Sequence, residues 1–226
     1  MTTPATPGPL ALVGGAEWRP GCDFDAELLA ASGTTEVVVL PTAAAYEHPE
    51  RAVEFARAWF ATLGASVRGL MVLRRSDAED AEHAAVVRDA RFIYLGGGSP
   101  LHLRSVLKAS AVWDALLAAW RDGAVLAGSS AGAMVLTDPM VDPRGGAFTL
   151  GLGVVSQLAI VPHAETWSHD RAHRTISLAP ASLPIAAIDE RTALVLDHDR
   201  GWRASGAGSV AVWLAGAEAG LDALPR

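Results

Sequence analysis

The chain has 226 residues, of which 50% are hydrophobic and 19% are charged, a composition that supports a buried core and excludes an intrinsically disordered chain. The formal net charge is −7, which excludes nucleic acid as the expected partner because phosphate binding needs a basic surface. Cys22 is the single cysteine, so no intrachain disulfide can form, in keeping with a cytoplasmic protein. The first residues lack the pattern of a signal peptide, and no apolar run is long enough for a membrane span. We therefore expect one cytoplasmic domain over residues 1–226 that binds neither nucleic acid nor a membrane.

Apolar runs of strand length alternate with segments of helical period in the first part of the chain. Runs rich in valine and leucine predict buried strands at 10–15, 36–43, 67–73, in the first half of 91–100, and at 124–128. Apolar positions at helical spacing predict helices at 23–31, 51–63, 77–90, from 101 onward, and at 112–122. This alternation indicates an α/β three-layer sandwich with a mainly parallel sheet and helices on both faces. The last third predicts a short antiparallel edge, with strands near 154–161, 185–189, 192–197 and 209–214.

The small-residue stretch AGSSAGA, residues 127–133, lies between a predicted buried strand and the apolar run AMVL. It contains the pattern G-x-S-x-G with Ser130 at its centre. Between a strand and a helix this pattern is typical of a nucleophile elbow, in which small residues permit a sharp turn that exposes the serine hydroxyl. A tight turn without chemistry would use the same small residues. The buried strand before the turn and the apolar segment after it favour the nucleophile.

A serine nucleophile needs an oxyanion site and a base. The amide of Ala131 follows the nucleophile, and Gly97 or Gly98 in the turn GGGSP can supply a second amide, because the carboxyl ends of parallel strands meet at one edge of a sheet. The same turn lacks the G-x-G-x-x-G pattern and its following acidic residue, so no dinucleotide cofactor is expected. His163 ends the apolar run 158–162 and is the candidate base.

The acidic partner of the histidine has several candidates. Glu190 lies in a turn between two apolar segments, while Asp138 and Asp142 follow the elbow helix more closely. The order serine, histidine, glutamate differs from the order serine, acid, histidine of the α/β-hydrolases. His198 as the base, with an aspartate earlier in the chain as the acid, would restore that order, so His198 stays an alternative base.

A histidine cluster after the elbow raises the question of a metal. His163, His169 and His173 are closely spaced, and HDRAH superficially has the form of H-E-x-x-H. An aspartate replaces the glutamate of that motif, and the segment is polar rather than a buried helix. We therefore expect no metal, and interpret this segment as a solvated helix start that carries Arg171 and Arg174.

Four motifs together, YLGGGSP, GSSAGA, IVPH and IDERTAL, resemble peptidase family S51, that of dipeptidase E and cyanophycinase. Their order is that of the family, and the resemblance extends from the first strand to about residue 197. It implies a fold like that of class I glutamine amidotransferases, with a serine in place of the amidotransferase cysteine. The roles that it implies are Ser130 as nucleophile, His163 as general base, Glu190 as the acid, and Gly98 and Ala131 as oxyanion amides. Some family members have instead been assigned an aspartate just after the elbow helix.

Two departures from the family concern the substrate. Ser99 follows the glycines where the family usually has asparagine or glutamine, and Ala164 follows the histidine where the family usually has an aromatic residue. A cyanophycin substrate is therefore not expected. The residues that we expect to bind substrate are Gly97, Ser99, Arg171 and Arg174. The arginines suit a carboxylate, to which a guanidinium can donate paired hydrogen bonds.

The sequence thus predicts a serine peptidase that cleaves a small peptide, an acidic dipeptide among the candidates, through an acyl-enzyme on Ser130. A non-catalytic, ligand-binding or regulatory member of the same fold is the alternative that the departures leave open. Glutamine amidotransfer is disfavoured because Cys22 lies far from the elbow in sequence. No cofactor is expected, and whether the chain forms a homodimer stays open.

Overall fold

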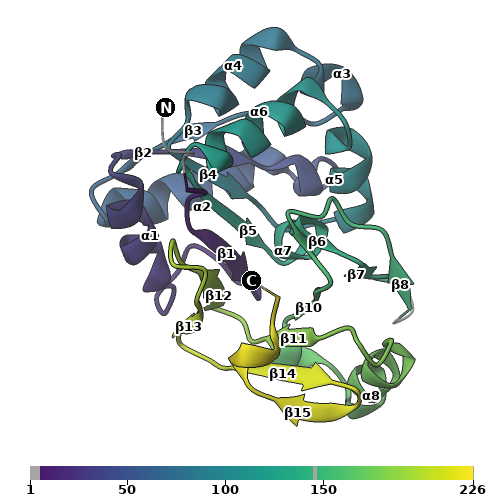
Figure 1. The fold of residues 1–226 in the computed structure, drawn as a ribbon. Coiled ribbons are helices and arrows are strands. Elements are labelled where there is room, and N and C mark those ends of the chain that lie inside the picture. Colours follow the sequence, from purple (N-terminus) through teal and green to yellow (C-terminus); the bar gives the residue numbers. More distant parts are fainter. Residues whose placement is uncertain (1–5, 145–146, 226) are drawn as a thin grey trace, which may run out of the picture.

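A computed structural model describes residues 6–144 and 147–225, except for the side chains of residues 169, 171 and 172. Its centre is a seven-stranded sheet in the order β13-β12-β1-β5-β4-β2-β3 (Figure 1). From β1 to β3 all neighbours in this order are parallel, while β12 and β13 add an antiparallel edge. The strands are β1 (Leu10–Val13), β2 (Glu36–Leu40), β3 (Ser66–Gly69), β4 (Phe92–Leu95), β5 (Val125–Ser129), β12 (Thr192–Leu196) and β13 (Trp202–Gly206).

Helices cover both faces of this sheet. They are α1 (Phe24–Ser32), α2 (Pro49–Thr62), α3 (Arg75–Ala78), α4 (Ala81–Asp89), α5 (Pro100–Leu107), α6 (Ala111–Arg121) and α7 (Ala131–Leu136). Alternate strand residues pack on opposite faces of the sheet. Leu12 and Leu126 belong to one core cluster, together with residues of α4 to α7. Their neighbours Val13 and Ala127 belong to a second cluster, together with residues of α1 and α2. Because both faces of the central strands β1, β4 and β5 are buried, these strands consist almost entirely of apolar and small residues, as the sequence pattern indicated. The predicted α/β fold is confirmed.

The C-terminal third departs in part from the single antiparallel edge that the sequence predicted. Only β12 and β13 extend the main sheet, whereas four other strands form a second sheet in the order β10-β11-β14-β15. These are β10 (Ala159–Pro162), β11 (Ile185–Ile188), β14 (Val210–Leu214) and β15 (Ala217–Ala219). Within this sheet β10 and β11 are parallel, with α8 (His169–Leu178) between them in the chain. The remaining pairs, β11 with β14 and β14 with β15, are antiparallel.

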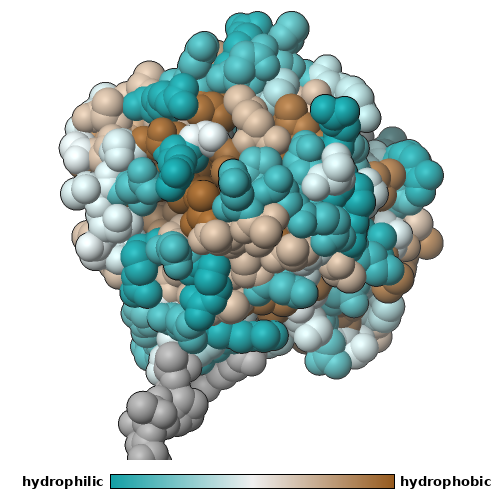
Figure 2. All heavy atoms as spheres, turned by 90° about the horizontal axis from the view of Figure 1, so that it is seen from above, coloured by the Kyte–Doolittle hydropathy of each residue, from teal (hydrophilic) through white to brown (hydrophobic). Residues whose placement is uncertain are grey.

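Short elements complete the described chain. Two-residue strands pair as β6 (Thr137–Asp138) with β9 (Val155–Ser156) and as β7 (Met140–Val141) with β8 (Phe148–Thr149). Single 3-10 turns lie at η1 (Thr42–Ala44), η2 (Ala164–Thr166) and η3 (Leu221–Ala223). Figure 2, which views the molecule from above the orientation of Figure 1, shows a mainly hydrophilic and intermediate surface with small hydrophobic areas between. Among the described residues, no helix combines the length and the apolar character that crossing a membrane requires.

One predicted helix is two in the structure. The segment 77–90 divides into α3 and α4, because the Asp80 carboxylate accepts hydrogen bonds from the amides of Glu82 and His83 and so begins a new helix. The strand expected at 67–73 already ends at Gly69.

The second sheet is attached at the carboxyl end of β1. The amide of His163, which follows β10, donates to the carbonyl of Gly14 at 2.7 Å, and the amide of Arg191 donates to Gly15 at 2.8 Å. These contacts bring the ends of β10 and β11 next to the ends of β1 and β5. Sites in parallel sheets form at this edge.

Candidate active site

Ser130 lies in the turn between β5 and α7 and has a backbone conformation that residues other than glycine rarely adopt, with φ 49° and ψ −106°. The two glycines of the motif are required by the close packing of this turn. A Cβ on Gly128 would lie 2.6 Å from the carbonyl carbon of Gly132, and one on Gly132 would lie 2.4 Å from the carbonyl oxygen of Leu95. A strained conformation of this kind costs about 1–3 kcal/mol and occurs mainly at functional sites. The geometry is that of a nucleophile elbow.

Ser130, His163 and Glu190 form one chain of hydrogen bonds. The Ser130 Oγ lies 2.9 Å from Nε2 of His163, and Nδ1 of the same ring lies 2.8 Å from Oε1 of Glu190. The histidine and the glutamate side chains are each about one third exposed, at 33% and 34%. A histidine between a hydroxyl and a carboxylate can take a proton from the hydroxyl while the carboxylate orients the ring and stabilises its charged form.

A glycine in the first loop leaves room for the histidine ring. Gly15 has φ +123°, and a Cβ built on it would lie 2.1 Å from Cε1 of His163. His163 itself has a left-handed backbone at φ 52°, and its amide is held by Gly14. The sequence analysis did not single out Gly15, because nothing in the local pattern shows which ring it faces.

Glu190 is held by a second glutamate, which sequence reasoning also missed. The amide of Glu190 donates to both carboxylate oxygens of Glu165, each at 3.0 Å. On the other side, the amide of Arg191 donates to Gly15. The position of the acid is therefore fixed through its backbone, which leaves its carboxylate directed at His163.

The structure places the other acid and base candidates elsewhere. The Asp138 carboxylate accepts the amide of Gly151 at 2.8 Å. Asp142 pairs with Arg144, at 2.9 and 2.7 Å, and the hydrogen bonds from Arg144 lower the pKa of Asp142 to about 2. His198 is exposed in the turn between β12 and β13. It follows Leu196, which pairs with Leu10 at the start of β1, so it lies at the opposite end of the sheet from Ser130.

The two predicted oxyanion residues lie next to the nucleophile. Gly98 has φ +132°, and a Cβ on it would lie 2.3 Å from the carbonyl oxygen of Ala43, so only glycine fits. In the described part of the chain the Gly98 amide has no hydrogen-bond acceptor, whereas the Gly97 amide donates to Glu17 at 3.2 Å. Ala131 is the first residue of α7, so its amide has no acceptor within the helix. Their assignment as oxyanion donors stays a prediction.

A pocket of about 230 Å³ adjoins Ser130. Its lining is mostly apolar and comprises Gly98, Pro100, Ser130, Met134, Val141, Pro143, Pro162, His163, Thr166 and Trp167. No arginine or lysine is among these described lining residues. The walls from β7 and from the segment after His163 were not predicted, because their contact with the elbow is set by the second sheet and its connections.

The residues expected to bind substrate have different positions. The Ser99 hydroxyl accepts the amide of His102 at 3.3 Å and so caps α5. Gly97 lies between Glu17 and Ser130. Arg174 is exposed on α8 and is not among the residues that line the pocket. The Arg171 side chain lies outside the described residues.

The described side chains also bear on metal binding and amidotransfer. No group of three or more His, Cys, Asp or Glu side chains is arranged to hold a metal ion among the residues with described positions.

Cys22 is buried, its thiol donates to the carbonyl of Ala16, and burial raises the pKa of the thiol to about 11. A thiol of this kind is a poor nucleophile.

The sequence is similar to that of known proteins. A family model described as peptidase family S51 matches residues 12–202. Curated cyanophycinases from Synechococcus elongatus and Thermosynechococcus vestitus are 29% identical over 154 residues, which cover 63% of this chain and 48% of theirs. The chain thus spans about half the length of these relatives.

Solved structures match over almost the whole chain. A crystal structure of a peptidase from an acI-B1 Actinobacterium is 29% identical with a TM-score of 0.86, and covers 96% of this chain and 95% of that one. A second crystal structure is that of a protein from Listeria monocytogenes EGD-e, assigned by name to peptidase E. It is 19% identical with a TM-score of 0.65, and the match covers 91% of this chain and 98% of that one. At this identity the likeness supports the fold alone. With the elbow and its histidine and glutamate in place, the family match over most of the chain means that this protein belongs to peptidase family S51.

Proposed function

We propose that the chain is a serine-type peptidase that hydrolyses small peptides through an acyl-enzyme on Ser130. The observation that carries this proposal is the continuous hydrogen-bonded chain from Glu190 through His163 to the Ser130 hydroxyl, at 2.8 and 2.9 Å. Family membership supports the same activity.

This geometry supports the following reaction. His163 takes the Ser130 proton at Nε2 as the serine oxygen attacks the scissile carbonyl, and the amides of Gly98 and Ala131 stabilise the developing oxyanion. The protonated histidine then gives its proton to the leaving amine, and the ester remains on Ser130. A water molecule, deprotonated by His163, attacks the ester and releases the acid while the proton returns to the serine oxygen. Glu190 keeps Nδ1 protonated throughout, so that Nε2 faces the serine.

The size of the site supports a small substrate. A pocket of about 230 Å³ beside Ser130 has room for little more than one or two residues. An acidic dipeptide is the finer proposal, and it would need a cation for the substrate carboxylate. We propose Arg174, which is exposed on α8, as this cation; this requires α8 to reach the bound peptide.

A dipeptide panel tests this proposal. The panel has aspartyl, alanyl and lysyl residues on the amino side of the bond, and product amines are quantified for the wild type, Ser130→Ala and Ser129→Ala. Ser129 is the matched control, because it is the adjacent hydroxyl but points to Glu17 rather than to His163. We expect hydrolysis by the wild type and a loss of about a thousandfold or more in Ser130→Ala, with a much smaller loss in Ser129→Ala, which removes only the hydrogen bond to Glu17. Hydrolysis by Ser130→Ala at the wild-type rate would exclude the proposal, and an aspartyl preference that survives Arg174→Ala would exclude Arg174 as its source.

A further inference from the structure

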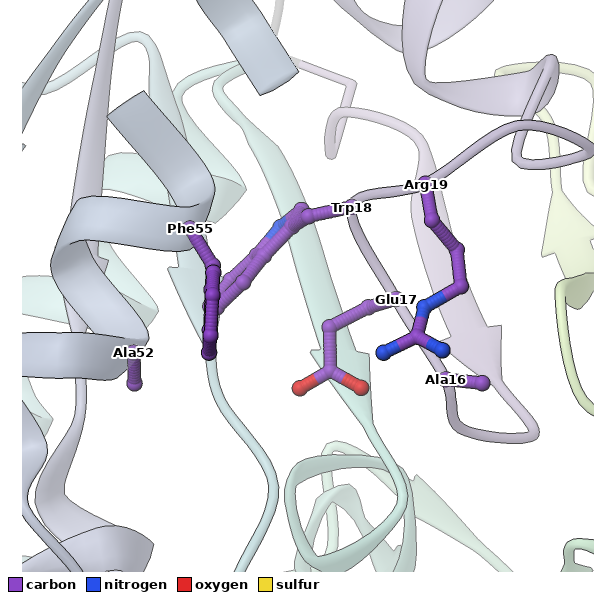
Figure 3. Close-up of a pocket in the computed structure, with 6 residues that line it drawn as sticks. All are labelled: Ala16, Glu17, Trp18, Arg19, Ala52 and Phe55. Atoms are coloured by element: carbon purple, nitrogen blue, oxygen red, sulfur yellow. The ribbon is translucent and has the colours of Figure 1, made fainter. Parts of the chain in front are cut away.

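A second pocket of about 410 Å³ lies close to the nucleophile and is not used by the mechanism above. Figure 3 shows its lining, which comes from the loop after β1 and from α2: Ala16, Glu17, Trp18, Arg19, Ala52 and Phe55. The carboxylate of Glu17 and the ring of Phe55 face this space in the same view.

Glu17 connects this pocket to the catalytic turn. Its Oε1 accepts the amide of Gly97 at 3.2 Å, and its Oε2 accepts the hydroxyl of Ser129 at 2.7 Å. A Cβ built on Gly97 would lie 3.4 Å from that Oε1 and 3.6 Å from the Cβ of Ser130. The carboxylate and the nucleophile therefore face the same small space above Gly97, and two hydrogen bonds fix the carboxylate there.

A carboxylate at this position needs a chemical reason. During acylation a negative charge develops on the carbonyl oxygen of the substrate, and a nearby fixed negative charge raises the energy of that state. A positive charge on the substrate, bound by Glu17, would offset this repulsion. The pocket also carries aromatic walls suited to a cation: Phe55 is 59% exposed despite its size, and Trp18 packs against Tyr94 with ring centroids 5.2 Å apart.

We propose that Glu17 binds a positively charged nitrogen of the substrate, which makes this pocket a recognition subsite beside the scissile bond. The inference rests on the proposed peptidase function. Two groups have this chemistry: a free α-amino group, which lies two bonds from the scissile carbonyl, and a lysine or arginine side chain, whose apolar stem would pack against Phe55 and Trp18. Arg19 also lines the pocket and is exposed. Figure 3 shows its guanidinium extending toward the Glu17 carboxylate, so this exposed side chain must make room for a substrate cation that binds Glu17.

The test uses two pairs of p-nitroanilide substrates. Alanine and N-acetylalanine p-nitroanilide differ in the α-ammonium charge, and N-acetyllysine and N-acetylnorleucine p-nitroanilide, acetylated at Nα, differ in the side-chain charge. We expect the wild type to prefer the charged member of at least one pair by about tenfold to a hundredfold in kcat/KM, the size of a charge-assisted hydrogen bond. The pair that shows the preference identifies which nitrogen is bound.

Glu17→Gln should reduce that preference to near unity. The glutamine can keep both hydrogen bonds, because its oxygen accepts from Gly97 and its amino group donates to the Ser129 oxygen. Glu36→Gln removes the same charge at the opposite end of the sheet, at the exposed start of β2, and should keep the preference. The rate at which a fluorophosphonate labels Ser130 shows that the nucleophile is intact in each variant.

Each outcome decides the inference. It is supported if the preference disappears in Glu17→Gln while labelling of Ser130 is retained. It is overturned if the wild type hydrolyses charged and neutral substrates equally, or if Glu17→Gln keeps the preference. If Ser130 is not labelled and no substrate is hydrolysed, the peptidase proposal fails and the inference fails with it. Labelling and hydrolysis without a charge preference would leave the peptidase proposal in place and exclude only the subsite.

Discussion

Replacing Glu190 by glutamine removes the carboxylate that supports His163 and leaves the size of the side chain unchanged. The Nδ1 to Oε1 distance is 2.8 Å. When the imidazolium forms, an opposite charge at about 4 Å is worth about 4 kcal/mol at an effective dielectric constant of about 20. Because the two side chains are 33% and 34% exposed, solvent screens part of this interaction, and about 2–4 kcal/mol is a reasonable range. Glu190→Gln should therefore lower kcat by about 30-fold to a thousandfold.

The assay is hydrolysis of the best peptide of the panel, with kcat and KM measured separately. Since the carboxylate acts on the charged histidine of the transition state, kcat should fall while KM stays close to the wild-type value. Asp142→Asn is the matched control, because it removes a carboxylate that pairs with Arg144 instead of His163, and it should retain near wild-type kcat. A Glu190→Gln variant within about threefold of the wild-type kcat, or a larger loss in Asp142→Asn, would refute Glu190 as the acid.

Two other predictions concern residues that position His163 and Glu190, and a third concerns a buried carboxyl group in α1. Gly15→Ala should lower kcat by about a hundredfold or more with an unchanged circular dichroism spectrum, because the new Cβ would lie 2.1 Å from the His163 ring. Gly33→Ala is the control, because Gly33 also has a positive φ but a Cβ there would meet no atom within 4 Å. Equal losses of kcat in the two variants would contradict the reasoning. Glu165→Ala should lower kcat by about tenfold without raising KM, because the Glu190 amide loses its acceptor, and Glu165→Gln should restore most of the loss. Burial raises the pKa of the Asp25 carboxyl well above its ordinary value. The folded state therefore binds the carboxyl proton more tightly than the unfolded state does. The stability that this proton contributes is lost as the pH rises from about 4 through the folded-state pKa. Asp25→Asn should therefore raise the melting temperature more at pH 8 than at pH 4. An equal shift at both pH values would contradict a raised pKa.

Local patterns predicted the parts of the site that depend on neighbours in sequence. The two glycines that flank Ser130 in the motif predict a sharp turn between a strand and a helix, and so predict the elbow. His163 is predicted as the base because it follows directly after an apolar run of strand length. The choice of Glu190 over Asp138 and Asp142 came mainly from family resemblance, and the 2.8 Å contact with His163 agrees with it.

The features that the sequence did not reveal depend on contacts between distant segments. Gly15 is necessary because the ring of His163, which follows a strand of the second sheet, lies against it. Glu165 matters because its carboxylate accepts the amide of a residue that follows it by 25 positions. The division of the C-terminal strands between two sheets is likewise set by which strands pair, and β13, with the sequence WRASG, has too few apolar residues to be recognised as a strand.

The central claim is that Ser130 is the nucleophile, and mass spectrometry of the protein treated with a fluorophosphonate tests it most directly. The account predicts one adduct per chain, on the peptide that contains Ser130, absent in Ser130→Ala and strongly slowed in His163→Ala. No adduct on the folded wild type, as a non-catalytic family member would give, or an unchanged adduct in Ser130→Ala, would contradict it.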